Sequence, residues 1–166
     1  MPTNLRNWST RLFTFGLLAI TGLAQNPENS KFYKLEFTVK EIEGTRPASS
    51  RTYSMVAVAD GPNSSIRAGS KVAIPGTSAQ VSFIETGVNI DCRQIKEIQN
   101  ELSLTVTADI SSAAQEGTTP SYPVIRQNKW GSNVMVPLRK PTLIFSSDDI
   151  MTQRQLQLEL TATPIK

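Results

Sequence analysis

The sequence predicts an all-β protein: an antiparallel β-sandwich or a partly closed barrel of about eight strands, after an N-terminal signal segment. Three observations point to this class. Apolar and polar residues alternate with a period of two along most of the chain. Short segments rich in Gly, Pro, Asn and Asp separate the alternating runs. Helical crossover segments of the kind that parallel strands need are missing, so the strands are expected to pair antiparallel.

The first 24 residues are expected to be a signal peptide. Arg6 and Arg11 are basic, and Leu12–Ala24 is an apolar run of about 13 residues, which suits a signal-peptide core and is short for a membrane span. Gly22 and the final Ala of this run supply the small residues that precede a cleavage site. The alternative is an N-terminal membrane anchor that is never cleaved. Residues 25–30 then form a short flexible N-terminus.

Composition removes several classes of function. The chain has 17 basic and 14 acidic residues, and the signal segment holds two of the basic ones, so the mature chain is nearly neutral and carries no nucleic-acid footprint. It has no histidine, which excludes histidine triads and histidine metal sites. A single cysteine excludes an intramolecular disulfide and a multi-cysteine zinc site. We therefore expect no enzyme, no cofactor, no metal and no small-molecule ligand.

The first half of the mature chain reads as strands with one buried face. Along Lys31–Ile42, the side chains of Tyr33, Leu35 and Phe37 share one face, and charged or hydroxyl side chains share the other. Similar runs follow at Arg51–Val58, at Ile66–Ile74 around Gly69, and in the two short apolar runs of Val81–Cys92 that Gly87 interrupts.

The second half continues the pattern. In Gln155–Thr163 the alternation places Leu156, Leu158 and Leu160 on one face, as a sandwich core or a barrel wall would require. One polar window, Arg93–Glu101, fits either a short helix of about two turns or the tip of a hairpin. The remaining runs are Leu102–Ile110, Trp130–Val136 and the short Leu143–Phe145. With no duplicated segment and no internal linker, residues 31–166 are expected to form a single domain.

Two groups invite a catalytic or metal-binding reading, and neither is favoured. Cys92 has no histidine to make its thiolate, so we interpret it as a small, partly buried strand side chain, with an intermolecular disulfide as the alternative. The adjacent acids Asp148 and Asp149 point opposite ways on an extended chain, which suits a turn or a helix cap better than a shared cation site.

Two aromatic residues are candidate partner contacts. Trp130 stands between Lys129 and Gly131, and Tyr122 lies in a proline-rich segment. Tryptophan and tyrosine are enriched at protein interfaces because they bury a large area and still offer a polar group. Core packing is the alternative for Trp130.

Several segments, taken in order, carry a family resemblance. Ile66–Pro75 is a glycine-centred strand that ends in an apolar residue and proline, and Val81–Asp91 leads from an aromatic and an acid into Gly-Val. The next strand, Leu102–Ser112, ends in two serines. A Pro-Val-Ile hairpin follows, with the segments Pro123–Gln127, Val134–Val136 and Thr142–Phe145. In this order the segments resemble the C-terminal β-domain of bacterial secretins, the outer-membrane pore family of type II secretion and type IV pili.

The mature chain also resembles small secreted proteins of unassigned function from soil bacteria of the acidobacterial type. The segments that carry this likeness are Tyr33–Phe37 and Arg51–Met55. The two resemblances imply a stand-alone, secretin-like domain that is exported to the periplasm or outer membrane of a Gram-negative bacterium.

The function that follows is a non-catalytic cell-envelope β-domain that binds or assembles with envelope or secretion components. Its partner would be another envelope protein or a second copy of the chain, and membrane association stays open. The alternative is a subunit of an oligomeric, secretin-like β-barrel pore in the outer membrane.

Overall fold

The described residues of the structure, a computed structural model, are 30–75, 81–114, 123–149 and 154–165. They form eight strands and no helix, which confirms the all-β class and the expected strand number. The polar window that also fitted a helix is strand and turn. The strands are β1 (Phe32–Glu43), β2 (Arg46–Val58), β3 (Ser64–Pro75), β4 (Val81–Ile98), β5 (Glu101–Ala114), β6 (Val124–Pro137), β7 (Thr142–Asp149) and β8 (Arg154–Ile165).

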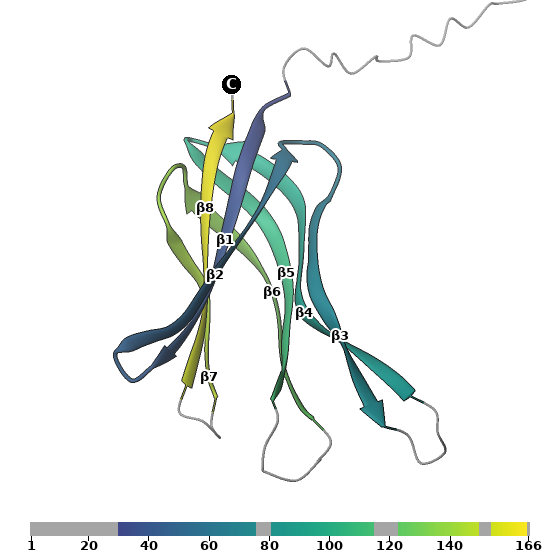
Figure 1. Cartoon of the computed structure of the whole chain (residues 1–166). Coiled ribbons are helices and arrows are strands. Elements are labelled where there is room, and N and C mark those ends of the chain that lie inside the picture. The colour runs from purple at the N-terminus through teal and green to yellow at the C-terminus, as the bar shows by residue number, and fades with distance from the viewer. Residues whose placement is uncertain (1–29, 76–80, 115–122, 150–153, 166) are drawn as a thin grey trace, which may run out of the picture.

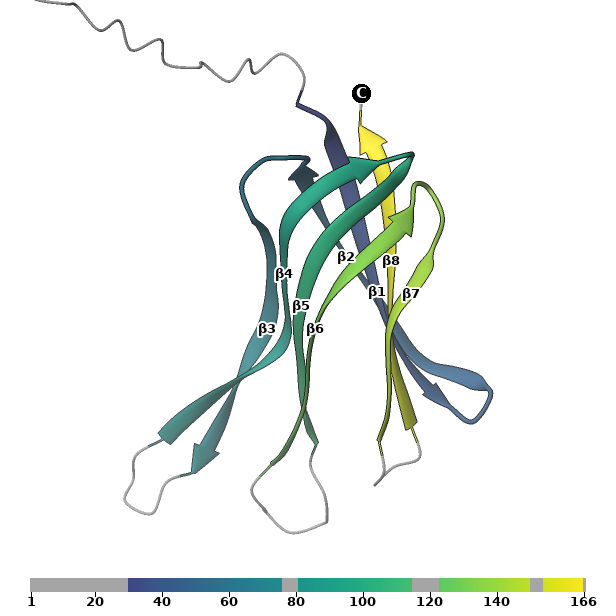
Figure 2. The ribbon, with the colours of Figure 1, turned by 180° about the vertical axis from the view of Figure 1, so that it is seen from behind.

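The strands form two four-stranded antiparallel sheets that face each other. One sheet has the order β2-β1-β8-β7 and the other has the order β3-β4-β5-β6 (Figures 1 and 2). Among the described residues the only bridge outside these ladders joins Leu138 to Ala162, where the Arg139 amide also donates to the Ala162 carbonyl at 2.7 Å. The architecture is therefore a β-sandwich, the first of the two predicted alternatives, rather than a closed barrel.

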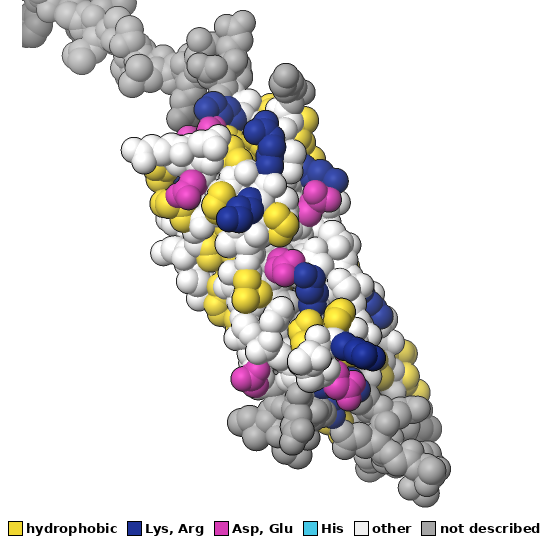
Figure 3. Space-filling view, turned by 90° about the vertical axis from the view of Figure 1, so that its left-hand side faces the viewer, with side chains coloured by type: hydrophobic (Ala, Val, Ile, Leu, Met, Phe, Trp, Pro, Cys, Tyr) yellow, Lys and Arg dark blue, Asp and Glu magenta, His cyan; other side chains and the backbone are white. Residues whose placement is uncertain are grey.

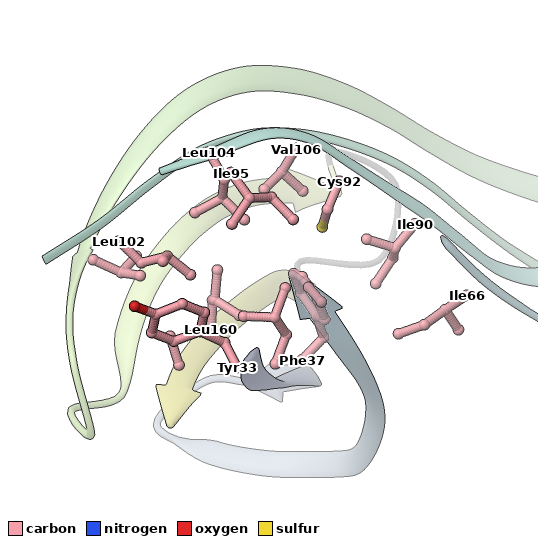
Figure 4. Close-up of a cluster of buried hydrophobic side chains, with 14 of the residues drawn as sticks. Tyr33, Phe37, Ile66, Ile90, Cys92, Ile95, Leu102, Leu104, Val106 and Leu160 are labelled. Atoms are coloured by element: carbon pink, nitrogen blue, oxygen red, sulfur yellow. The ribbon is translucent and has the colours of Figure 1, made fainter. Parts of the chain in front are cut away.

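The core lies between the inner faces at one end of the sandwich. From β1, the side chains of Tyr33, Leu35 and Phe37 point inward and are 0–1% exposed, as the alternation predicts (Figure 4). Leu158 and Leu160 of β8 join them from the same sheet. The opposite sheet contributes Ile66, Val88, Ile90, Cys92, Ile95, Leu102, Leu104, Val106, Ala108 and Val136.

The polar window at Arg93–Glu101 is the end of one strand and the tip of a hairpin. β4 runs on to Ile98, and a two-residue turn at Gln99 and Asn100 leads into β5. Both turn residues have left-handed φ angles, 49° and 67°, which is the type I′ pattern that matches the twist of paired strands. A bulge near Gln94 shifts the register and returns Ile95 to the core, where it is 3% exposed.

Two glycines bring β3 and β4 unusually close together. Gly69 and Gly87 lie opposite each other in the ladder, and Gly87 has a φ of 147°. A Cβ at Gly87 would lie 2.2 Å from the Ala68 carbonyl oxygen, and one at Gly69 would lie 2.3 Å from that of Thr86. No other residue type fits at either position without moving backbone.

The β3–β4 hairpin leaves its sheet at this glycine pair. The ladder between β4 and β5 ends at Val88 and Ile110, and just beyond it the Gly87 amide donates to Ser111 Oγ at 3.0 Å. Farther along, the β3–β4 hairpin, the β5–β6 hairpin and the sheet of β1, β2, β7 and β8 diverge from one another at the end of the molecule opposite the core (Figures 1 and 2). The molecule therefore has a packed end and a splayed end.

Candidate interaction surface

The inward-facing side chains change from apolar to charged where the two sheets separate. On β1 the buried series continues from Val39 to Glu41, and on β2 it continues from Tyr53 to Arg51. On β6 an arginine, Arg126, occupies a position that faces the same space. Because charged side chains are costly to take out of water, these positions mark the end of the dry core.

A cleft of about 920 Å³ lies between the sheets at this point. Apolar side chains of both sheets line its inner part, and Arg51, Arg126, Arg154 and Glu41 line it toward the splayed end. Arg154 is ion-paired with Glu43 at 3.3 Å, and both side chains are largely exposed to solvent. This mixed lining describes an open gap between two separating sheets rather than a pocket shaped for one ligand.

The cleft was not predicted from the sequence, although a signal for it was present. The signal is the position at which an inward series passes from apolar to charged, as from Val39 to Glu41. That change has meaning only once it is known which strands face each other, and alternation alone does not give the pairing.

Among the described residues, the four strands at the sheet edges have no backbone ladder partner on their outer side. These strands are β2 and β7 in one sheet and β3 and β6 in the other. Three of them are long, with 13 residues in β2, 12 in β3 and 14 in β6. Long edges with free N–H and C=O groups are templates for pairing with another strand.

A second copy of the chain can extend each sheet by adding its strands at the sheet edge. Four antiparallel strands leave the two edge strands of a sheet running in opposite directions. A β7 strand placed beside the β2 strand of another copy would therefore pair antiparallel, like every pair within the molecule. The same holds for β6 and β3 in the other sheet.

The backbone register identifies the outward-facing groups of β2. The Ala59 amide donates to the Lys31 carbonyl at 2.9 Å, which makes this a hydrogen-bonded pair. Because such pairs alternate along an antiparallel ladder, Thr52, Ser54 and Val56 direct their N–H and C=O groups away from β1. The Val56 carbonyl does point outward, since it accepts from Ser64 Oγ at 3.5 Å.

Trp130 lies on β6 with its side chain toward the inner face. It is opposite the buried Ala108, and its ring packs against Phe145 of β7 with a centroid distance of 5.4 Å. This contact joins the neighbouring edges of the two sheets. A partner-contact role for Trp130 stays a prediction. Tyr122, the second candidate contact, lies outside the described residues.

The structure places Cys92 in the core and Asp148 within a strand. Cys92 is fully buried, and burial followed by the charge of Asp91 raises the pKa of its thiol to about 12. Asp148 lies in β7 and accepts a hydrogen bond from Gln155 Nε2 at 2.9 Å. It is thus part of a strand and not the turn or helix cap that was expected. The described residues contain no cluster of three metal-ligating side chains.

The packed end carries one short polar network. Glu97 accepts hydrogen bonds from the Tyr33 hydroxyl and, at 2.6 Å, from Lys31 Nζ. The Lys31 bond and then the Tyr33 bond hold the pKa of Glu97 below its usual range. Burial, assisted by the hydrogen bond to Glu97, raises the pKa of Tyr33. The network ties the start of β1 to the end of β4.

The charged side chains that Figure 3 shows are mixed in sign along the length of the molecule, with apolar patches between them. Paired charges are common on the outer faces of both sheets, as in Lys40–Glu159 at 2.6 Å and Arg67–Asp91 at 2.7 Å. That face therefore has no broad patch of one charge sign.

No protein-family model and no curated protein sequence matches the chain. Solved structures do match it in fold. The secretin InvG of the Salmonella SPI-1 type III secretion injectisome aligns with 82% of this chain and 64% of its own, with a TM-score of 0.51 and 6% identity. The type II secretion system secretin GspD of E. coli K12 aligns with 82% of this chain and 50% of its own length, with a TM-score of 0.51 and 10% identity.

The chain has a secretin-like fold. ExeD of Aeromonas hydrophila adds a third match, with a TM-score of 0.50 and 9% identity over 82% of this chain. This secretin-like chain spans about half to two thirds of the length of the secretin chains that it matches. The described part of the chain contains no helix that is long and apolar enough to cross a membrane.

Proposed function

We propose that this chain is a non-catalytic β-domain of the bacterial cell envelope that assembles through its open sheet edges with copies of itself or with another secretion component. The observation that carries the proposal is the pair of four-stranded antiparallel sheets whose edge strands run in opposite directions. Such sheets can be extended indefinitely by the same pairing, which is the geometry of a closed ring or of a docked partner strand.

Three further observations support the proposal. The secretin-like fold is one that solved secretins also have. The only cysteine is buried and protonated, and the chain has no histidine, so the usual nucleophile and base are missing. The apolar segment Leu12–Ala24 with its basic flank is typical of an export signal.

An outer-membrane pore subunit is the more specific version of this function. Edge pairing of both sheets around a ring would generate two concentric walls of strands. The cleft, which is polar toward its open end, would then lie between the walls. A pore subunit and a docked domain differ in one measurable respect. Only the pore would be a multimeric ring that needs detergent for its extraction from the membrane.

The test is fractionation of cells that produce the tagged chain at its native level, after treatment with a cleavable cross-linker. We expect the chain in the envelope fraction, cross-linked to further copies or to one recurrent partner. A detergent-requiring, multimeric species would identify the pore subunit. A soluble chain that cross-links to nothing would refute the proposal.

A further inference from the structure

One row of residues crosses the whole β2-β1-β8-β7 sheet at its splayed end and alternates in charge. The ladders pair Arg46 with Glu43, Glu43 with Arg154, and Arg154 with Asp149. From β2 to β7 the row therefore reads basic, acidic, basic, acidic. Opposite charges that face each other on neighbouring strands stabilise a sheet, and like charges destabilise it. We refer to these four residues as the charged row.

The middle of the charged row is paired within one copy of the chain, and its β2 end is open. Arg154 and Glu43 form an ion pair at 3.3 Å, with side chains that are 43% and 62% exposed. Arg46 is exposed and makes no ion pair within the described part of the chain. At the opposite end, Asp149 lies on the edge strand β7. The two edges of this sheet thus end the same row with opposite charges.

A second copy that places its β7 beside β2 continues the charged row. When the two copies are aligned without stagger, Asp149 of the second copy takes the position opposite Arg46 of the first. The alternation of basic and acidic residues then runs from copy to copy without a break. A shift of two residues along β7 would bring Ser147 to this position and lose the match, and a shift of one would place it on the other face. The row therefore favours one register.

The β3-β4-β5-β6 sheet has the opposite arrangement at its edges. Its ladders place four residues in one row, which are Arg67, Asn89, Asp109 and Lys129. Both ends of that row are basic, and neither β3 nor β6 contains an acidic residue. Aligned copies would bring Lys129 opposite Arg67, which is a like-charge pair. Both cations already have acids in their own sheet, Asp91 at 2.7 Å and Asp109 at 3.5 Å. Charge thus favours in-register pairing of copies in one sheet and opposes it in the other.

We propose, as a more specific form of the assembly proposed above, that copies of this chain join in register between β2 of one copy and β7 of the next, with Arg46 opposite Asp149. The partner of the β2 edge is then a second copy of the chain. Because the two joined edges differ, each copy keeps one free edge of each kind, so the same junction repeats until the array closes. The basic edges of the other sheet contribute no attraction to this junction.

The experiment reverses the charge at each end of the charged row. Arg46→Glu places two acidic residues at the junction, and Asp149→Arg places two basic residues there. Association is followed by the light-scattering mass of the purified mature chain over a range of concentrations, and circular dichroism checks that each variant is folded. Lys129→Glu is the matched control, because it reverses one well-exposed charge on an edge strand of the other sheet.

We expect the wild-type chain to associate, and to do so less tightly at high salt because exposed charge pairs are screened. Arg46→Glu alone and Asp149→Arg alone should each weaken association by about fivefold or more, since attraction is replaced by repulsion. Lys129→Glu should not weaken it. An equimolar mixture of the Arg46→Glu and Asp149→Arg proteins should associate again, because every junction between unlike variants pairs opposite charges.

Two results would overturn the charge-matched junction and leave assembly through sheet edges intact. One is a wild-type chain that associates no more tightly than Arg46→Glu and Asp149→Arg. The other is a mixture of these two variants that associates no better than either alone. A wild-type chain that stays monomeric at every concentration also overturns it, and one that in addition cross-links to no partner in cells refutes the proposed function itself.

Discussion

Cys92 is a residue whose surroundings keep its thiol from reacting in the folded protein. Its side chain is fully enclosed between the sheets, and the pKa of its thiol is raised to about 12. Thiol reagents attack the thiolate and need physical access, and Cys92 offers neither in the folded protein.

We therefore predict that Cys92 reacts with a disulfide reagent at neutral pH only when the chain unfolds. The native protein should show almost no labelling over a time in which a Ser65→Cys variant, with an exposed position on β3, is fully labelled. In denaturant both thiols should react together. Rapid labelling of native Cys92 would mean that the sandwich opens at its core.

The carboxylate of Glu97 gives a prediction for pH. Its pKa is lowered in the folded protein by Lys31 and Tyr33, so the folded state binds its proton less readily than the unfolded state does. The stabilisation is therefore present above the ordinary pKa of a glutamate and is lost as the pH falls through the lowered value. Urea unfolding of wild type and Glu97→Gln should show a difference at neutral pH that shrinks in acid. A difference that grew in acid would contradict this role.

At the scale of elements, the glycine pair determines where the β3–β4 hairpin leaves its sheet. Alanine at Gly87 would place its Cβ 2.2 Å from a backbone oxygen and at a φ of 147°. We predict that Gly87→Ala lowers the free energy of unfolding by about 2 kcal/mol or more.

Gly131→Ala is the matched control for this change. Its nearest non-neighbour atom would lie 3.6 Å from the added carbon, so the effect should stay within about 0.5 kcal/mol. Denaturant titration of both variants checks the pair. Equal stabilities for the two variants would show that the close approach at Gly87 does not restrict the fold.

The Trp130–Phe145 contact is the second element-scale feature, because it joins β6 to β7 across the edges of the two sheets. We predict that Trp130→Ala costs about 2 kcal/mol of unfolding free energy and that Trp130→Phe costs less than half of that. A double-mutant cycle with Phe145→Ala measures the coupling. An unchanged stability in Trp130→Ala would instead favour the partner-contact role predicted from the sequence.

The sequence predicted where the individual strands lie better than it predicted which strands pair with each other. Strict alternation in Lys31–Ile42 and Gln155–Thr163 assigned the inward residues of β1 and β8, because a period of two follows directly from strand geometry. That these two strands pair, with Phe37 opposite Leu160, was beyond reach, since alternation carries no information about partners more than a hundred residues away. The contact between Gly69 and Gly87 was hidden for the same reason.

At the scale of the whole molecule, one end is held by a dry core and the other end is open. The packed end contains the apolar inner faces, and the splayed end contains the cleft and the ends of the hairpins. The candidate interaction surface was only partly predictable. Its edges follow from sheet order, which alternation does not give, whereas the runs Ile66–Ile74 and Val81–Cys92, which lie in β3 and β4, were visible in the sequence.

The central claim is that copies or partners join at the sheet edges, and its most direct test is the light-scattering mass of the purified mature chain over a range of concentrations. Ser54→Pro removes an outward-facing N–H of β2 and leaves the bonds to β1 intact, whereas Ser54→Ala keeps that N–H. We predict a mass of several chains for wild type and Ser54→Ala, and a shift toward the single-chain mass for a folded Ser54→Pro. A wild-type chain that stays monomeric at every concentration, or an assembly that Ser54→Pro leaves unchanged, would contradict pairing of copies through the β2 edge.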